Sequence, residues 1–309
     1  MSLILKRIIM VFLGVMGAFI VWPCLLTIQY FQMSFPGFFQ FSLAQGMAFG
    51  LVFGAIFGSF EGIIVSSRNK AFTGMLFGAI AGTAAGAIGV TVGQSFLFYS
   101  GDIILSSMGN IKNIALIAAN GVAWVLIGIF VSMIEGFRSR SIRKTIVGLF
   151  GGIVGGLIGG MTLQMHLYFF PGQPYALLGG LVIFGFSLSY FYSTFENRFS
   201  LGAIKLLNGP LKNREYNLVK NKISIGSLNS CDIVLTGYHN VAPLHAWITI
   251  KKGRVLFTPA TNATQNKGLT LVNGATVVMV NDEKKEESTL RREDVFSVGS
   301  AKFMYGVFS

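Results

Sequence analysis

Charged side chains are scarce in this chain. Only 12% of its 309 residues are charged and 52% are hydrophobic, whereas a typical soluble domain has about 25% charged residues. This deficit excludes an ordinary soluble protein and predicts a membrane protein. Acidic residues are rarest before Gly202, where the chain has 4 acidic and 10 basic residues. From Gly202 to the C-terminus it has 8 acidic and 14 basic residues. The balance favours contact with anionic membrane lipids. Because no stretch is arginine-rich or interleaved with aromatics, no nucleic-acid partner is expected.

Cysteine, histidine and the usual catalytic motifs are also in short supply. The two cysteines, Cys24 and Cys231, fall in different predicted domains, so no disulfide framework follows and a reducing compartment suits the C-terminal part. His166 has no metal-ligating neighbour at a useful spacing. The chain contains no phosphate-cradling glycine loop, no metal-ligand cluster and no nucleophile beside a plausible base. We therefore expect no enzyme activity, no metal site and no cofactor.

Glycine, by contrast, is abundant, with 39 residues, and many of them recur every fourth position. The two series are Gly46, Gly50, Gly54, Gly58 and Gly62, then Gly74, Gly78, Gly82 and Gly86. In a water-soluble helix each glycine would cost about 1 kcal/mol relative to alanine. In a bilayer the backbone must close its own hydrogen bonds, so a helix forms regardless. A stripe without side chains then lets the backbone of a second helix approach closely. The pattern therefore predicts packed transmembrane helices of the glycine-zipper kind.

A shift of 74 residues superimposes two halves of this region, since Glu61 falls on Glu135 and Lys70 falls on Lys144. The matching glycines are Gly54, Gly74, Gly78, Gly82 and Gly86 with Gly128, Gly148, Gly152, Gly156 and Gly160. Small residues match easily in a glycine-rich chain, but charged matches are harder to explain by chance. The sequence predicts a duplicated helical hairpin, with repeats at about 46–98 and 120–172.

Six apolar segments are long enough to cross the hydrocarbon core, for which about 20 residues suffice. The first, Ile8–Ile28, is too long for a signal peptide and lacks a cleavage site, so it is expected to remain as a span. The other five are Phe41–Val65, Phe72–Phe98, Ile114–Phe137, Thr145–Phe170 and Leu177–Phe195. We expect residues 1–198 to form a transmembrane domain.

The basic residues between these segments predict their orientation. A cytoplasmic N-terminus leaves only Lys112 of the loop cations outside. It places nine inside, namely Lys6, Arg7, Arg68, Lys70, Arg138, Arg140, Arg143, Lys144 and Arg198. The positive-inside rule therefore predicts that both termini are cytoplasmic. A bacterial inner membrane is the expected location.

Two acids, Glu61 and Glu135, lie at matching places near the cytoplasmic ends of the second and fourth spans. A charge there costs up to a few kcal/mol, so a functional role has to be weighed. In one interpretation the two acids line a pathway for protons or cations. In the other, which we favour, they are helix-end carboxylates paired with Arg68 or with Arg138 and its neighbours.

After Ser200 the pattern changes to short alternating apolar runs broken by Asn, Gly and Pro. The expected strands are Ile204–Leu207, Tyr216–Val219, Lys222–Ile225, Ile233–Leu235, Ala246–Ile250, Arg254–Thr258, Leu269–Val272, Thr276–Val280, Val295–Val298 and Lys302–Val307. About ten short strands in this length predict a β-sandwich over residues 203–309.

Four blocks of this domain resemble the forkhead-associated (FHA) family in the family's order. They are Ile223-Ser-Ile-Gly-Ser-Leu-Asn-Ser-Cys-Asp-Ile-Val-Leu235, Val241-Ala-Pro-Leu-His-Ala-Trp-Ile248, Val272-Asn-Gly274 and Leu290-x-x-x-Asp-Val-x-x-Val-Gly299. The resemblance covers about one third of the chain and implies a β-sandwich that recognises phosphothreonine in partner proteins. It also implies scaffold roles for Gly226, Asp232, His245, Asn273 and Gly274.

The chain departs from that family where phosphate is normally held. The resemblance implies an arginine at position 227 and a serine at position 242, but the chain has Ser227 and Ala242. A serine hydroxyl cannot replace the bidentate, charge-assisted bonds of a guanidinium. A third loop position, Asn262, sits in a stretch longer than the family's usual one. Lys222, Lys251 and Lys252 remain as sources of general attraction to phosphate.

These features predict a membrane-anchored interaction or assembly protein, of the kind used in signalling. It would present an FHA-like module to a cytoplasmic protein partner, phosphorylated or not, without the usual phosphothreonine recognition. The alternative is a channel or transporter component whose glycine-rich bundle is regulated by the β domain, because parallel repeats occur in transporters. Membrane lipids are expected partners, and self-association into a homo-oligomer is left open.

Overall fold

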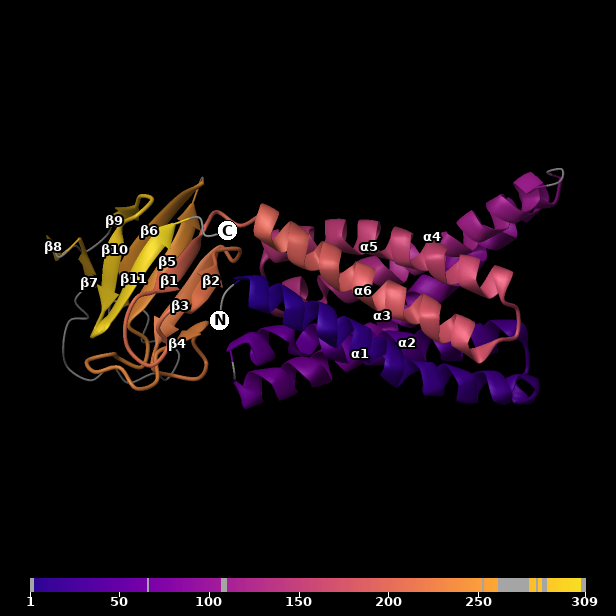
Figure 1. Ribbon diagram of the computed structural model, residues 1–309, viewed down its shortest axis with the longest axis horizontal. Helices are drawn as coiled ribbons and strands as arrows, with labels where there is room; N and C mark the ends of the chain where they lie inside the picture. Colours follow the sequence, from indigo (N-terminus) through magenta and orange to yellow (C-terminus); the bar gives the residue numbers. More distant parts are fainter. Residues whose placement is uncertain are drawn as a thin grey trace. The chain divides into compact units, whose positions relative to one another are not determined.

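The computed structural model describes residues 3–65, 67–106, 110–251, 253–260, 278–281, 283–284 and 288–306. The chain forms two compact units. The helical unit contains Arg7–Arg198, and the β unit contains Phe199–Ser309 together with Met1–Lys6. Long helices come first and β-sheets follow (Figure 1), which confirms the predicted fold class.

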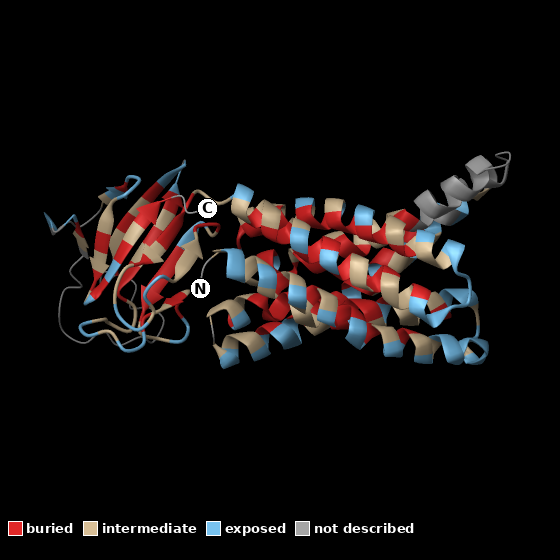
Figure 2. Ribbon diagram, viewed as in Figure 1, coloured by how far each residue is buried: buried red, intermediate tan, exposed pale blue. Residues whose placement is uncertain are grey.

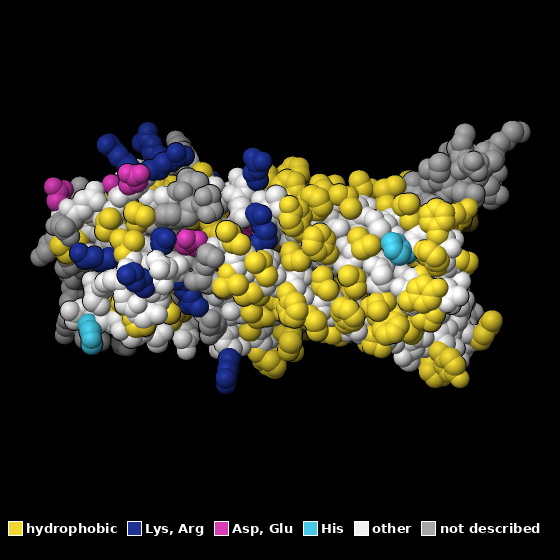
Figure 3. All heavy atoms as spheres, viewed as in Figure 1, with side chains coloured by type: hydrophobic (Ala, Val, Ile, Leu, Met, Phe, Trp, Pro, Cys, Tyr) yellow, Lys and Arg dark blue, Asp and Glu magenta, His cyan; other side chains and the backbone are white. Residues whose placement is uncertain are grey.

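Six helices of the described residues are long and apolar enough to cross a membrane. They are α1 (Leu3–Tyr30), α2 (Phe38–Val65), α3 (Arg68–Ser106), α4 (Asn110–Arg138), α5 (Ile142–Phe169) and α6 (Pro174–Arg198). A short 3₁₀ helix, η1 (Gln32–Ser34), follows α1. Buried residues run along the inner faces of the helices (Figure 2), while hydrophobic side chains cover much of the face of the helical unit seen in Figure 3. Ile80 is one of the exposed large apolar residues. An apolar exterior is what a helix bundle needs in a lipid solvent.

The helices α2 and α3 pack backbone against backbone through their glycines. A Cβ atom placed on any of these glycines would collide with a carbonyl oxygen of the facing helix. The facing pairs are Gly46 with Gly86, Gly50 with Gly82, Gly54 with Gly78 and Gly58 with Gly74. One number rises as the other falls, so the helices are antiparallel. Side chains at these positions would force the helices apart.

The hairpin of α4 and α5 shows related contacts 74 residues later. A Cβ on Gly148 would collide with Ser132, which stands where Gly58 stands in the first hairpin. A Cβ on Gly152 would lie 2.5 Å from the Cα of Ile129 and 2.7 Å from the carbonyl oxygen of Gly128. The contact is therefore close, but only α5 contributes an unbroken row of glycines.

The turns of the two hairpins also correspond. The Ser67 amide donates to the Gly62 carbonyl at 2.9 Å, and the Ser141 amide donates to the Gly136 carbonyl at 3.1 Å. Each serine hydroxyl then accepts from the amide three residues on, at 3.5 Å in the first turn and 3.4 Å in the second. A serine in this position caps the N-terminus of the helix that follows.

The opposite side of α5 carries a second glycine row, which faces α6. A Cβ on Gly151, Gly155 or Gly159 would lie 2.7 to 2.8 Å from a Cα atom of α6. The interior beside this contact is aromatic, since Phe49 stacks on Phe53 with ring centroids 4.4 Å apart. Phe184 lies edge-on to Phe49 at 5.2 Å. Edge-to-face and offset-stacked rings of this kind add stability beyond simple burial.

The β unit contains two sheets around one apolar core. The first sheet has the order β2 (Glu215–Asn217), β1 (Ala203–Leu206), β11 (Ala301–Gly306), β10 (Val295–Val298), β7 (Val278–Val280) and β8 (Glu283–Lys284). The second has the order β4 (Ile233–Val234), β3 (Lys222–Gly226), β5 (Ala246–Lys251), β6 (Arg254–Pro259) and β9 (Ser288–Leu290). Only β3 and β4, among the described strand pairs, run parallel.

Two strands of this unit were absent from the sequence prediction. Both β8 and β9 fall in a stretch of charged residues where no apolar alternation marks a strand. They lie at the ends of their sheets, where one face or edge meets solvent and little apolar burial is required. The strand expected at Leu269–Val272 lies outside the described residues.

Candidate functional site

The loops that follow β3 and precede β5 bring Ser227 and Ala242 together. The Ser227 amide donates to the Ala242 carbonyl at 3.1 Å, and the Leu228 amide donates to the Pro243 carbonyl at 3.2 Å. The two loop positions at which the resemblance implies phosphate ligands are therefore neighbours in space. The surface formed by residues 227–231 and 239–244 is called the loop face.

The His245 side chain supports the second loop of this face, residues 239–244. The imidazole is buried, with 4% of the residue exposed, and its Nδ1 lies 3.2 Å from the amide nitrogen of Ala242. Because Nδ1 accepts that bond, the neutral ring carries its proton on Nε2. The His245 amide donates to the Ile225 carbonyl at 2.8 Å, which ties the start of β5 to β3. His245 thus supports the backbone of the loop face.

Asp232 organises the other end of the first loop. Its Oδ2 accepts from the amide and the hydroxyl of Ser224 at 2.9 and 2.8 Å. Its Oδ1 lies 2.7 Å from the Nζ of Lys220. Gly226 completes this support, because a Cβ there would collide with the Pro243 carbonyl. These bonds fix the backbone course of the loop, and the cation among them, Lys220, is paired with Asp232.

The lysines expected to attract phosphate are placed elsewhere. Lys222 begins β3 whereas Ser227 follows its end, and five residues of strand span about 16 Å. The ammonium of Lys222 instead lies over the Trp247 ring, 3.8 Å from its centroid. Lys251 ends β5, at the opposite end of that strand from Ala246 and the loop face. Neither Lys222 nor Lys251 therefore lies on the loop face, and their general attraction to phosphate stays a prediction. Lys252, Asn262, Asn273 and Gly274 lie outside the described residues.

A second polar site lies inside the helical unit, where Lys144 bridges the two acids singled out in the sequence. Its Nζ is 3.4 Å from Glu61 Oε2 and 3.3 Å from Glu135 Oε1. Lys144 lies in the first turn of α5, while Glu61 and Glu135 lie near the ends of α2 and α4. All three side chains are largely buried, Glu135 most of all with 2% of the residue exposed. One ammonium thereby joins both hairpins.

Arg138 makes a second connection between the hairpins. Its Nη1 is 3.8 Å from Glu135 Oε2 and donates to the Gly58 carbonyl at 3.1 Å. Its Nη2 donates to the Lys70 carbonyl at 3.0 Å. The guanidinium at the end of α4 therefore binds the backbone of both α2 and α3. Of the two arginines considered from the sequence, Arg138 contacts an acid among the residues that the structure describes.

Sequence reasoning missed the bridging role of Lys144, which it placed in a cytoplasmic loop as the counterpart of Lys70. It also missed Glu196 of α6, which is buried and interacts electrostatically with Lys144. In the sequence, Lys144 and Glu196 each lie near a helix end beside other charged residues, and this position could have indicated an ion pair. The glycines Gly78, Gly82, Gly152 and Gly156 lie at the helix contacts described above. No group of His, Cys, Asp and Glu in the described ranges could hold a metal ion.

No protein-family model and no curated protein matches this chain, whereas solved structures do. The FHA domain of the CT664 protein from Chlamydia trachomatis is 23% identical over 35% of this chain and 97% of its own, with a TM-score of 0.28. The FhaA FHA domain, complexed with the intracellular domain of Rv3910, is 19% identical over 33% and 97%, with a TM-score of 0.27. EmbR of Mycobacterium tuberculosis, in complex with a low-affinity phosphopeptide, is 14% identical over 84% and 72%, with a TM-score of 0.28. These values are too low to carry any residue's role to this chain.

Proposed function

We propose that this protein is a membrane-anchored interaction or assembly protein whose β domain binds a cytoplasmic protein partner without the usual phosphothreonine recognition. The helical unit is the anchor and the loop face is the contact surface. No chemistry is proposed for either unit, since Lys144 pairs with Glu61 and Glu135, and His245 and Asp232 bind backbone amides at the two loops. The β domain keeps the scaffold of an FHA-like module and lacks its phosphate ligands.

The observation that supports this proposal best is the direct bond between Ser227 and Ala242. It places the two positions side by side, where an arginine and a serine would converge on one phosphate. The residues present offer one hydroxyl and one methyl group. His245 and Asp232 bind backbone amides at both places, which suits the surface to protein contact. A preorganised loop loses less entropy on binding than a mobile one.

A capture experiment tests the proposed contact. The full chain in detergent is used to bind partners from lysate, with and without phosphatase treatment. The loop variant carries Asn229→Arg and Ser230→Arg, both at exposed positions of the loop face, and the matched control carries Lys302→Glu on β11. We expect a partner that survives phosphatase treatment and is lost only with the loop variant. Capture that requires phosphorylation, or that ignores the loop variant, would contradict the proposal.

The proposed anchoring places both termini in the cytoplasm, in an inner membrane. Six apolar helices and the nine-to-one distribution of loop cations support it. Single cysteines at Met108→Cys and Ser309→Cys, in a chain without native cysteines, report each side in intact cells. An impermeant reagent should label position 108 and spare position 309. The reverse pattern would invert the topology.

We also propose that the two hairpins arose by duplication of one glycine-zipper unit. The corresponding serine turns and the corresponding contacts of Gly74 with Gly58 and Gly148 with Ser132 support this origin. Residues that match after the shift should then respond in the same direction to the same substitution.

A channel or transporter component remains the second candidate, and one observation favours it. The cluster of Lys144, Glu61 and Glu135 is buried between hairpins that, on this proposal, are membrane-embedded. Buried ionisable groups within membrane-spanning segments commonly mark ion or proton pathways. Proteoliposomes loaded with a pH-sensitive dye decide between the roles. Proton flux that is abolished by Glu135→Gln favours transport, and its absence leaves the cluster as a structural connection.

A further inference from the structure

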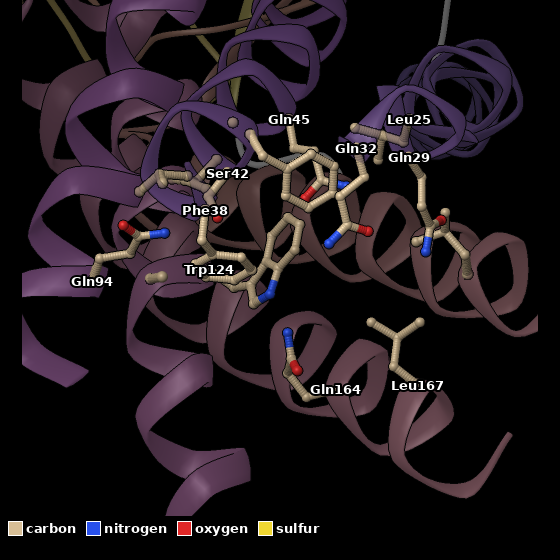
Figure 4. Close-up of a pocket in the computed structure, with 17 residues that line it drawn as sticks. Leu25, Gln29, Gln32, Phe38, Ser42, Gln45, Gln94, Trp124, Gln164 and Leu167 are labelled. Atoms are coloured by element: carbon tan, nitrogen blue, oxygen red, sulfur yellow. The ribbon is translucent and has the colours of Figure 1, made fainter. Parts of the chain in front are cut away.

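A pocket of about 350 Å³ lies at the end of the helical unit away from the Lys144 cluster. Residues from all six helices and η1 line it, most of them from α2, α3 and α4 (Figure 4). This volume falls in the range of about 300–1,000 Å³ typical of small-molecule sites. The space is therefore large enough to hold a ligand of one sugar ring or a comparable group.

Glutamine side chains dominate the polar part of this lining. Five of the eight glutamines of the chain contribute, namely Gln29, Gln32, Gln45, Gln94 and Gln164. They come from α1, η1, α2, α3 and α5, so no single stretch of sequence brings them together. Within the described part of the chain, none of these five amides is hydrogen-bonded to another protein group. Their donors and acceptors are available to a ligand.

The lining also restricts the charge of that ligand. No Lys, Arg, Asp, Glu or His occurs among the residues that line the pocket in the described structure. A phosphate, a carboxylate or an ammonium group would leave its hydration without gaining a counter-charge, which is costly. Each primary amide offers two donors and an acceptor with two lone pairs. Hydroxyl groups, which both donate and accept, match such a lining best.

An aromatic wall completes the pocket. Gln32, Gln45 and Gln164 lie around the indole of Trp124 (Figure 4). The indole is held edge-on to Phe49 and Phe184, with ring centroids 5.1 and 5.5 Å away. It therefore presents a fixed apolar surface beside the amides. A flat apolar face next to several hydroxyl-matching groups is suited to a ring that has hydroxyls on its edge and C–H groups on its face.

We propose that this pocket binds an uncharged, hydroxyl-rich small molecule with one apolar face. A free sugar or polyol and the headgroup of a neutral glycolipid share this chemistry. The amides of Gln45 and Gln94, from α2 and α3, bind the hydroxyls, and Trp124 packs against the apolar face. The site is independent of the loop face, so either assignment can fail without the other.

Trp124 provides the readout. The full chain is placed in phosphatidylcholine nanodiscs with Trp22→Phe and Trp247→Phe, which leaves Trp124 as the one tryptophan of the three. Its emission is followed during titration with glucose and, separately, with octyl glucoside below its micelle-forming concentration. We expect a saturable change with at least one of them. A response to glucose identifies a free sugar, whereas a response to the glucoside alone identifies a lipid-linked one.

Matched variants locate the binding. Gln45→Leu with Gln94→Leu should weaken it roughly tenfold or more, because each lost neutral hydrogen bond weakens binding a few-fold. Gln40→Leu with Gln173→Leu changes two glutamines outside the pocket and should leave the affinity unaltered. If the double variant loses its helical circular-dichroism signal, Gln164→Leu alone replaces it and should weaken binding a few-fold.

Three results would overturn the proposal. The first is the absence of a saturable change with both sugars. The second is equal affinity in the parent and in a folded variant of the pocket glutamines. The third is an equal response to decanol, which has one hydroxyl and an apolar chain, or to inorganic phosphate, which is charged.

Discussion

The two central hairpins use glycine differently although their sequences correspond. In the pair α2 and α3 both helices present glycine, and each missing side chain faces a carbonyl of the partner. In the pair α4 and α5, Gly152 meets Ile129 as well as Gly128, and Gly156 meets Val125. The second hairpin gains another glycine row instead, through which α5 also packs against α6.

The difference shows that a glycine period in sequence permits close packing but does not specify the partner. Reciprocal glycines give a contact of two backbones that has no room for adjustment. A one-sided row brings the helix against the backbone of larger residues, such as Ile129 of α4 and Leu188 of α6. Because α5 has two such rows, it can lie between two helices, whereas α3 uses its regular glycine row against one. The charged cluster then joins the two kinds of hairpin at one end.

Removing Lys144 should break the connection between the hairpins and produce the largest effect. Lys144→Met leaves Glu61 and Glu135 without their shared ammonium, and loss of one member of a buried ion pair costs about 3–5 kcal/mol. The free energy of unfolding can be measured by SDS titration of the chain in bicelles. The triple variant Lys144→Met, Glu61→Gln and Glu135→Gln should recover most of that loss. If the single variant is as stable as the parent, the cluster does not hold the hairpins together.

Adding one methyl group should distinguish the hairpins from each other. Gly82→Ala puts a Cβ against the Gly50 carbonyl, where both partners are backbone, and should cost about 1–3 kcal/mol as overpacking does. Gly156→Ala leaves 3.0 Å to the Cα of Val125, which a small shift relieves, so a cost below about 1 kcal/mol is expected. The same SDS titration measures both. Equal losses would mean that the two hairpins tolerate side chains alike.

The smallest change in stability is expected at a glycine whose added Cβ would make only van der Waals contact. A Cβ at Gly121 would lie 3.4 Å from the Cγ of Met161, which is van der Waals distance. Gly121→Ala should therefore change stability by no more than about 0.5 kcal/mol. Ile80→Leu, at an outward position with 75% of the residue exposed, provides a second neutral control. A large loss in either would show that the clash geometry of α2 and α3 is not what sets the cost.

Sequence reasoning identified the features that repeat along one helix or strand. The glycine period and the apolar runs predicted the six helices, because both depend on spacing within one segment. The alternation around Ile225 and Ile248 predicted β3 and β5 for the same reason. The charged stretch that forms β8 and β9 lacks such a period, and its strands depend on neighbours at the ends of the sheets.

What the sequence could not reveal depends on contacts between distant segments. Lys144 reaches Glu61 across 83 positions of sequence, and the pocket glutamines come from five separate elements. Ser227 and Ala242 could be paired in advance only through the family resemblance. Lys222 was considered for its charge alone, and its place at the start of β3, away from Ser227, depends on the fold. The cation on the Trp247 ring is a tertiary contact with no signature in spacing.

The central claim concerns the loop face, and one titration tests it most directly. Phosphothreonine peptide libraries and their unphosphorylated counterparts are titrated at physiological salt against the full chain and against the variant Ser227→Arg with Ala242→Ser. Each charge-assisted bond contributes roughly 1.5–3 kcal/mol, so restoring both groups should strengthen phosphate-dependent binding by about two to four decades. We predict no micromolar phosphate-dependent binding by the natural chain and a gain of such binding in the variant. Micromolar binding by the natural chain that depends on phosphate would contradict the claim.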